Sequence, residues 1–86
     1  MFRTSTHRTC TYIYPADHDV GAMMGFIGTV EWQPDENKES PWKVFISVKD
    51  KDGHSMGESI GRFHSREAGL VAFGYVYKDR ELKGQN

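Results

Sequence analysis

Cysteine and histidine are the side chains of this chain best suited to metal or nucleophilic chemistry, and their spacing favours neither. His7 and Cys10 lie three positions apart and His18 follows, but no second short-spaced pair completes the four ligands of a structural zinc site. Cys10 stands between two threonines, with no basic cluster near it in the sequence to lower the pKa of its thiol. We therefore expect a half-buried structural cysteine, no metal, no cofactor and no catalytic residue.

An acidic turn and two further histidines complete the residues with potential chemistry. Residues 50–53 place two carboxylates before a glycine, as calcium loops do, but Lys51 separates them and no distant glutamate is in register. A hairpin turn is expected here, with Gly53 supplying a positive φ. His54 and His64 flank the strand expected next, which holds them roughly 33 Å apart if it is fully extended. We do not expect them to act on one substrate.

Length and composition limit the class of protein. With 86 residues, we expect one domain spanning residues 1–86. Aromatic residues make up 13% of the chain, which argues against disorder, and the formal net charge of −1 argues against a dedicated nucleic-acid-binding domain. One cysteine allows no internal disulfide, and no apolar run approaches the roughly 20 residues of a membrane span. We therefore expect a cytoplasmic protein that has no membrane partner.

Alternation of apolar and polar residues predicts four antiparallel strands, at residues 9–14, 26–32, 42–49 and 54–63. The third is the clearest, and its apolar face consists of Trp42, Val44, Ile46 and Val48. Phe45 is an exception, because it falls among the polar residues of the other face. Gly57 and Gly61 in the fourth strand indicate a bulge or a close approach of another backbone.

A long helix is expected near the C-terminus. Ser65 is a good N-cap for a helix over residues 66–82, with Gly84 as its stop. A short helix is also expected at residues 17–24, whereas residues 1–8 are polar and expected to be frayed. The apolar face of the strands needs cover, and only the C-terminal helix is long enough to provide it. We predict an α+β fold, an antiparallel meander of three to four strands with this helix packed on one face.

The C-terminal helix carries two apolar stripes on nearly opposite sides. The stripe expected to face the sheet consists of Ala68, Val71, Ala72, Tyr75 and Val76. The second stripe consists of Leu70, Phe73 and Tyr77. If uncovered, it forms a patch with Phe73 at its centre and Arg66 and Arg80 at its rim, which is typical of a protein interface. The alternative is that the N-terminal segment wraps over this stripe, or that the sheet curls around the helix.

The order of elements in residues 41–77 resembles the second half of a double-stranded-RNA-binding domain. A strand at 44–48 precedes a glycine-containing strand at 57–61 and a capped helix that carries Ala68 and Ala72. The resemblance implies an αβββα fold that reads RNA shape and phosphates. The lysine cluster that begins the helix of that family is missing here. The remaining candidate nucleic-acid contacts are Lys43, Arg62 and Arg66.

In size, low cysteine content and a meander followed by a terminal helix, the chain also resembles small accessory proteins of phages and mobile elements, including anti-CRISPR inhibitors. The resemblance implies a non-enzymatic protein that occupies a surface of a host machine. We therefore predict an interaction protein, most specifically a phage-type inhibitor of a host defence complex, whose partner is another protein or a second copy of the chain. The alternative is a nucleic-acid-binding module like the RNA-binding domain, and an enzyme is least favoured.

Overall fold

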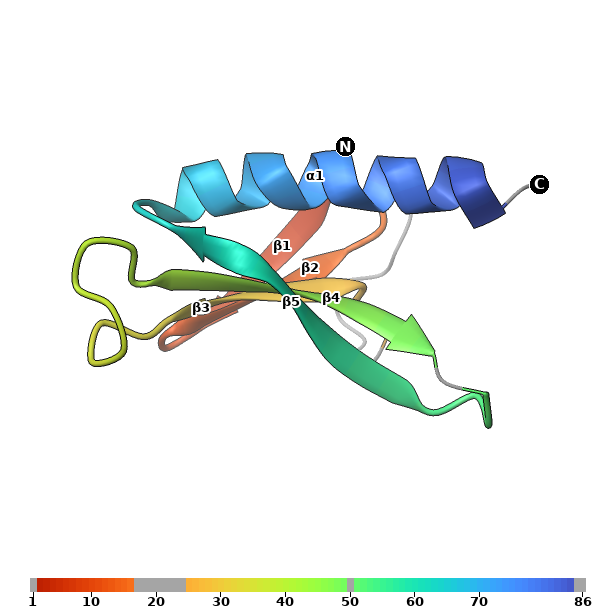
Figure 1. The fold of residues 1–86 in the computed structure, drawn as a ribbon, viewed down its shortest axis with the longest axis horizontal. Coiled ribbons are helices and arrows are strands. Elements are labelled where there is room, and N and C mark those ends of the chain that lie inside the picture. Colours follow the sequence, from red (N-terminus) through yellow and green to blue (C-terminus); the bar gives the residue numbers. More distant parts are fainter. Residues whose placement is uncertain (1, 17–24, 50, 85–86) are drawn as a thin grey trace.

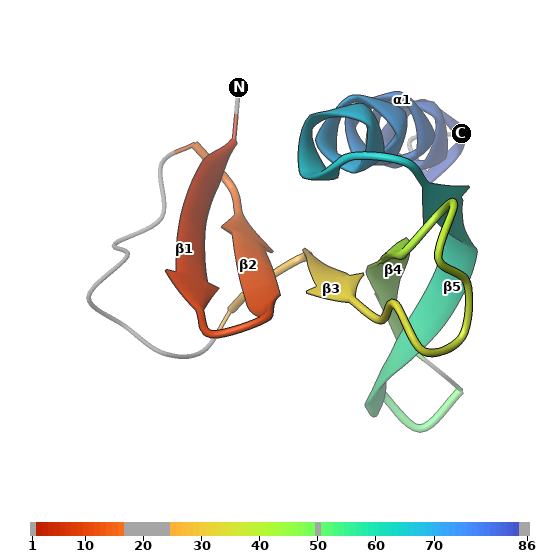
Figure 2. The ribbon, with the colours of Figure 1, turned by 90° about the vertical axis from the view of Figure 1, so that its left-hand side faces the viewer.

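The computed structural model describes residues 2–16, 25–49 and 51–84, which form a five-stranded antiparallel sheet and one helix (Figure 1). Each strand pairs with the next along the chain, so the sheet is a simple meander. Its elements are β1 (Arg3–His7), β2 (Cys10–Tyr14), β3 (Gly28–Trp32), β4 (Trp42–Lys49), β5 (Ser55–Phe63) and α1 (Arg66–Gly84). The helix lies along one face of the sheet (Figure 2), which confirms the predicted α+β class.

The N-terminal segment departs from the sequence-based expectation. Residues 1–8 were expected to be frayed, but Arg3–His7 forms β1 and pairs with β2 along its whole length. A two-residue turn joins the two strands, and Arg8 in this turn has a φ of 56°, as tight hairpin turns require. An apolar pattern cannot reveal β1, because it is a polar edge strand whose side chains are mostly exposed. The helix expected at 17–24 lies outside the described residues.

The remaining elements follow the predicted boundaries closely. The Ser65 hydroxyl accepts a hydrogen bond of 3.1 Å from the Ala68 amide, which confirms the N-cap. In β5, Gly61 pairs with Val44 while Ser59 pairs with Phe45, so one extra residue is inserted between the two pairs. The bulge expected from the glycines of this strand is therefore at Gly61, whose φ of 140° few other residues adopt.

The core lies between α1 and the face of the sheet formed by β2 to β5. Its fully or almost fully buried members are Ile13, Val30, Val44, Ile46 and Phe73. Val44 and Ile46 are on the face of β4 that the alternation predicts. The helix approaches the sheet closely at two glycines. A Cβ at Gly69 would lie 2.8 Å from the Val44 side chain, and one at Gly28 would overlap the Phe73 ring.

The orientation predicted for the helix is wrong. Val71 and Tyr75, expected in the core, are 61% and 75% exposed, whereas Phe73 is fully buried. Leu70 and Tyr77 pack against the same core, so the second stripe is the one that faces the sheet. Both stripes are apolar, so their composition does not decide which one faces the sheet. The ring of Phe73 fills the space that Gly28 leaves on β3, and this contact favours the second stripe.

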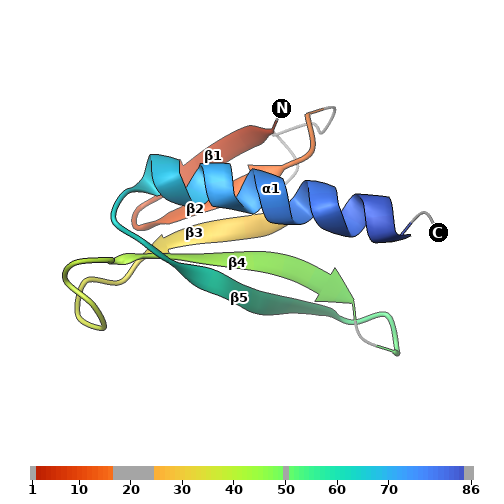
Figure 3. The same ribbon diagram turned by 45° about the horizontal axis from the view of Figure 1, so that its top comes forward.

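The start of β1 lies beside α1 (Figure 3). Phe2, which precedes β1, completes the cover of this stripe, as one of the alternatives proposed. The ring of Phe2 meets the ring of Phe73 edge-on at 5.3 Å and that of Tyr77 at 5.5 Å between centroids. Phe73 and Tyr77 stack on each other at 5.8 Å. These three rings link the start of the chain to its last element, which explains why Phe2 and the strand that follows it pack on the domain instead of fraying.

Two aromatic residues of α1 provide a matched test of this packing. We expect Phe73→Ala to lower the free energy of unfolding by about 3–5 kcal/mol, because it leaves a cavity above Gly28. Tyr75→Ala removes a ring of similar size from the exposed side and should change it by no more than about 0.5 kcal/mol. Urea unfolding followed by circular dichroism measures both, and equal losses at the two positions would contradict the helix orientation.

Candidate functional site

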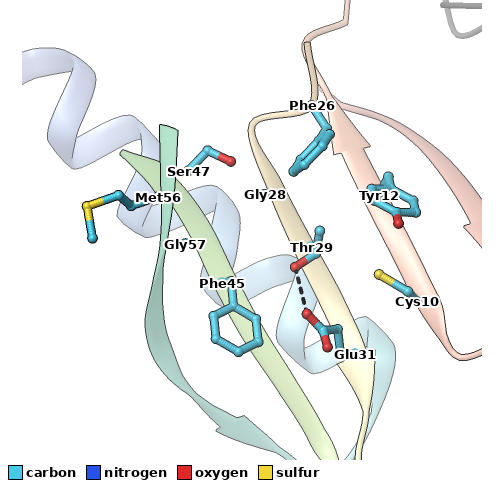
Figure 4. Close-up of a pocket in the computed structure, with 10 residues that line it drawn as sticks. All are labelled: Cys10, Tyr12, Phe26, Gly28, Thr29, Glu31, Phe45, Ser47, Met56 and Gly57. Carbon is cyan, nitrogen blue, oxygen red and sulfur yellow. Dashed lines mark hydrogen bonds between the residues drawn. The ribbon is translucent and has the colours of Figure 1, made fainter. Parts of the chain in front are cut away.

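The face of the sheet opposite α1 is not covered by any described element, and we call it the open face (Figure 2). Cross-strand pairing aligns its side chains in rows. One row runs from Tyr12 through Thr29 to Phe45, and the next row runs through Cys10, Glu31, Lys43 and Arg62. Phe45, the exception in the alternation of β4, therefore points away from the core and into this face (Figure 4).

A hollow of about 430 Å³ lies on the open face between β2 and β5. Tyr12 and Phe26 form one wall, with ring centroids 5.1 Å apart in an edge contact, and Phe45 stands on the other side (Figure 4). Thr29 and Glu31 lie between the walls. The complete lining is Cys10, Tyr12, Phe26, Gly28, Thr29, Glu31, Phe45, Ser47, Met56 and Gly57.

The hollow results from a large, small, large order of side chains across adjacent strands. Thr29 on β3 is the cross-strand partner of both Tyr12 on β2 and Phe45 on β4. The backbones of Tyr12 and Phe45 are therefore two strand spacings apart, each of about 4.8 Å. The small Thr29 does not fill the space between the rings. On the far side of Phe45, its partner on β5 is the small Ser59. The diagonal neighbour Gly57 has no side chain, and an added Cβ there would touch the Phe45 side chain at 3.8 Å. Phe45 is therefore the only large side chain of its row on β4 and β5.

Glu31 places a carboxylate in the hollow, and its hydrogen-bond partners among the described residues are neutral. The Thr29 hydroxyl donates to it at 3.4 Å and the Gln33 amide at 3.1 Å. Lys43 is its neighbour in the row, but the Lys43 ammonium pairs with Glu36 at 3.8 Å. Within the described part of the chain, Glu31 forms no ion pair.

The field of this carboxylate acts on the two acids beside it. The pKa of the Cys10 thiol is raised, first by burial and then by the charge of Glu31, while a hydrogen bond with Tyr12 partly opposes the rise. The pKa of the Tyr12 phenol is also raised, mainly by Cys10 and to a smaller extent by Glu31. Cys10 is partly buried, as expected, and its raised thiol pKa lowers the fraction of the reactive thiolate.

The interface predicted from the sequence does not exist as an exposed patch. Its three apolar members, Leu70, Phe73 and Tyr77, pack into the core, and full burial of Phe73 removes the proposed anchor. The two arginines of its rim remain at the surface. Arg80 pairs with Glu58 at 2.7 Å and Arg66 with Glu67 at 3.7 Å. Among the described side chains of α1, the large apolar ones that are exposed are instead Val71 and Tyr75.

The three basic residues proposed as nucleic-acid contacts do not form one surface. Lys43 and Arg62 are paired on the open face, and both form ion pairs with Glu36. Arg62 also donates to the Gln33 side chain at 3.3 Å. Arg66 begins the helix on the other side of the sheet. Acidic neighbours therefore accompany each of these cations.

The hollow and its aromatic lining were not predicted from the sequence. The position of Phe45 could have indicated a site on this face. A large aromatic residue on the polar face of an otherwise alternating strand has no packing role when the core lies on the other face only. Tyr12 gives the same signal, because it alternates with the buried Thr11 and Ile13. Phe26, which is 39% exposed, gives none, since it precedes β3 and contacts the hollow from the connecting segment.

The link between Glu31 and Cys10 can be tested by thiol chemistry. Glu31→Gln removes the negative charge that opposes thiolate formation, so the pKa of Cys10 should fall and its alkylation by iodoacetamide at pH 8 should become faster. Glu58→Gln, on the helix side of the sheet, is the control and should leave the pH–rate profile unchanged. An unchanged profile in Glu31→Gln would show that the two groups are not neighbours.

A metal-binding cluster, a membrane-spanning helix or similarity to a known protein would also indicate a function. In the described ranges, no cluster of three or more histidine, cysteine, aspartate or glutamate side chains is arranged to hold a metal ion. The described helix is not long and apolar enough to cross a membrane. No protein family, no curated protein and no solved structure matches this chain.

Proposed function

We propose that this chain is a non-enzymatic binding protein that contacts a protein partner through the open face of its sheet. The observation that carries the proposal is the hollow, in which aromatic side chains contributed by Tyr12, Phe26 and Phe45 surround a polar floor. These rings are not needed to fill the core, which lies on the other side of the sheet. A concave apolar surface with a few polar groups is typical of a binding site.

The composition of the open face fits a protein interface. Interfaces combine an aromatic centre with a polar rim, and the aromatic residues supply most of the binding energy. Here the aromatic hollow is bordered by a network of Glu36, Lys43 and Arg62. A patch of Val71 and Tyr75 on α1 is the competing surface. It borders a hollow of about 300 Å³ lined by Val71, Gly74, Tyr75 and Lys78, which offers one aromatic ring and a cation but no carboxylate.

The most specific form of this proposal is a phage-type inhibitor of a host defence complex. Its support is general: a chain of 86 residues, with one cysteine, folded as a meander and a terminal helix. Such a domain acts by covering a surface of its target, and the open face provides a surface for that purpose.

Comparison of two exposed aromatic positions tests which face binds. We expect Phe45→Ser to abolish the capture of a specific protein from cells that express the chain with an affinity tag, and Tyr75→Ser to leave it intact. The captured protein is then purified, and its affinity for both variants is measured by calorimetry. Loss of a central aromatic side chain should weaken binding about 30-fold or more. Loss of binding in Tyr75→Ser alone would assign the function to the helix.

The nucleic-acid alternative leads to a separate expectation. Because Lys43 and Arg62 are paired with Glu36, we expect binding to a 20-base-pair RNA duplex to be no tighter than about 10⁻⁵ M at physiological salt, the range of non-specific binding. Fluorescence anisotropy at several salt concentrations measures it. Tight binding that falls steeply with salt and is lost in the double variant Lys43→Ala, Arg62→Ala would favour the nucleic-acid function instead.

A further inference from the structure

We propose that the hollow on the open face binds a positively charged side chain, lysine or arginine, presented by a protein partner. This inference rests on the proposed function, because it names the chemical group that the open face recognises. It follows from the meeting of three aromatic rings, those of Tyr12, Phe26 and Phe45, with the carboxylate of Glu31 in one concave site.

The aromatic rings of the hollow favour a cation. The π face of an aromatic ring attracts a cation placed within about 6 Å of its centroid, and arrays of such rings are used to recognise ammonium groups. One ring of the hollow already has such a contact, since the Lys43 ammonium lies 5.3 Å from the centroid of Phe45. Lys43 itself does not line the hollow, so it leaves the space between the rings available.

The carboxylate of Glu31 also favours a cation. Glu31 is partly buried, and its two oxygens accept hydrogen bonds from Thr29 and Gln33, both of which are neutral. The nearest cation in its row, Lys43, is paired with Glu36. The negative charge of Glu31 is therefore not balanced by an ion pair with any described residue, and an incoming cation would balance it.

The sign of the local field agrees with this arrangement. Burial is the main cause of the raised pKa of Cys10, and Cys10 is the main cause of the raised pKa of Tyr12. The charge of Glu31 raises both pKa values further, so it makes a negative charge in the hollow less favourable. The same field favours a positive charge at that place. An anionic group, such as a phosphate or the carboxylate of an acidic peptide, is accordingly a poor occupant.

The shape of the site suits a long side chain with a charged end. Lysine and arginine have an apolar stem, which can lie against the rings of Phe26 and Phe45, and a cationic head, which can reach Glu31. The volume of about 430 Å³ is large enough for either side chain.

The test uses N-acetyl-lysine methylamide, with N-acetyl-norleucine methylamide as a neutral probe of similar apolar length. We titrate each into the isotopically labelled protein at millimolar concentrations and follow backbone amide signals by NMR. The lysine probe should shift the signals of Tyr12, Thr29, Glu31 and Phe45 and bind roughly 5-fold or more tightly than the norleucine probe. Glu31→Gln, which conserves shape, should weaken the lysine probe roughly 2- to 5-fold and leave the norleucine probe unchanged.

Phe45→Leu provides a second variant, since it keeps an apolar side chain on β4 but removes the ring, and it should weaken the lysine probe by a similar factor. The aromatic control is Tyr75→Leu on α1, which should have no effect. The isosteric Glu31→Gln decides the question even if Phe45→Leu disturbs the sheet.

The outcomes separate this inference from the proposed function. Equal binding of the two probes on the open face would overturn recognition of a cation while leaving the open face as the binding surface. If the lysine probe causes no shifts at the hollow while Phe45→Ser still loses the protein partner, recognition of a cation is likewise overturned and the open face remains the binding surface. Shifts confined to the helix around Val71 and Tyr75 would overturn both. A self-association that Phe45→Ser abolishes would identify the occupant as a second copy and contradict a cationic side chain of another protein.

Discussion

The contact between the ring of Phe73 and the backbone of Gly28 is the constraint on which the rest of the structure depends. The ring occupies the volume that any larger side chain at position 28 would take, and a Cβ at that position would also lie 2.6 Å from the carbonyl oxygen of Phe45. This contact fixes the rotation of α1 about its own axis, because it directs one particular side of the helix to the sheet. With that side fixed, Gly69 is placed over Val44, and Phe2 can close over the exposed edge of the Phe73 ring.

The sequence predicted the elements better than it predicted how they pack. The strands β2 to β5, the N-cap at Ser65 and the glycine bulge follow from local rules, such as alternation, capping and turn chemistry, and these rules act over a few residues. The rotation of α1 about its axis does not follow from local rules, because its two stripes differ little in apolar content. Which stripe faces the sheet depends on Gly28, a glycine in a distant strand. β1 was missed because a polar edge strand is defined by its hydrogen-bonded partner and not by its own composition.

The candidate site was missed for a related reason. Each residue of the hollow was visible in the sequence, but its place depends on the register of three strands, which brings Tyr12, Thr29 and Phe45 side by side. Because only one face of the sheet is covered by the helix, alternate residues of a strand serve either the core or the open face. Val30 and Val44 face the helix and stabilise the fold, whereas Thr29 and Phe45, next to them in sequence, face the solvent side. Substitutions in the hollow are therefore expected to change recognition with a smaller effect on stability than those in the core.

The bulge at Gly61 has a consequence for β1 and β5, the edge strands of the described sheet. An unpaired edge strand offers its amides and carbonyls to any other extended chain, and long flat edges are common starting points for aggregation. The edge formed by β5 is interrupted by the inserted residue and twisted at that point, and the edge formed by β1 is only five residues long and polar. Strand addition is thus impeded at both sides, so the protein can leave one whole sheet face accessible without becoming a template for its own fibrils.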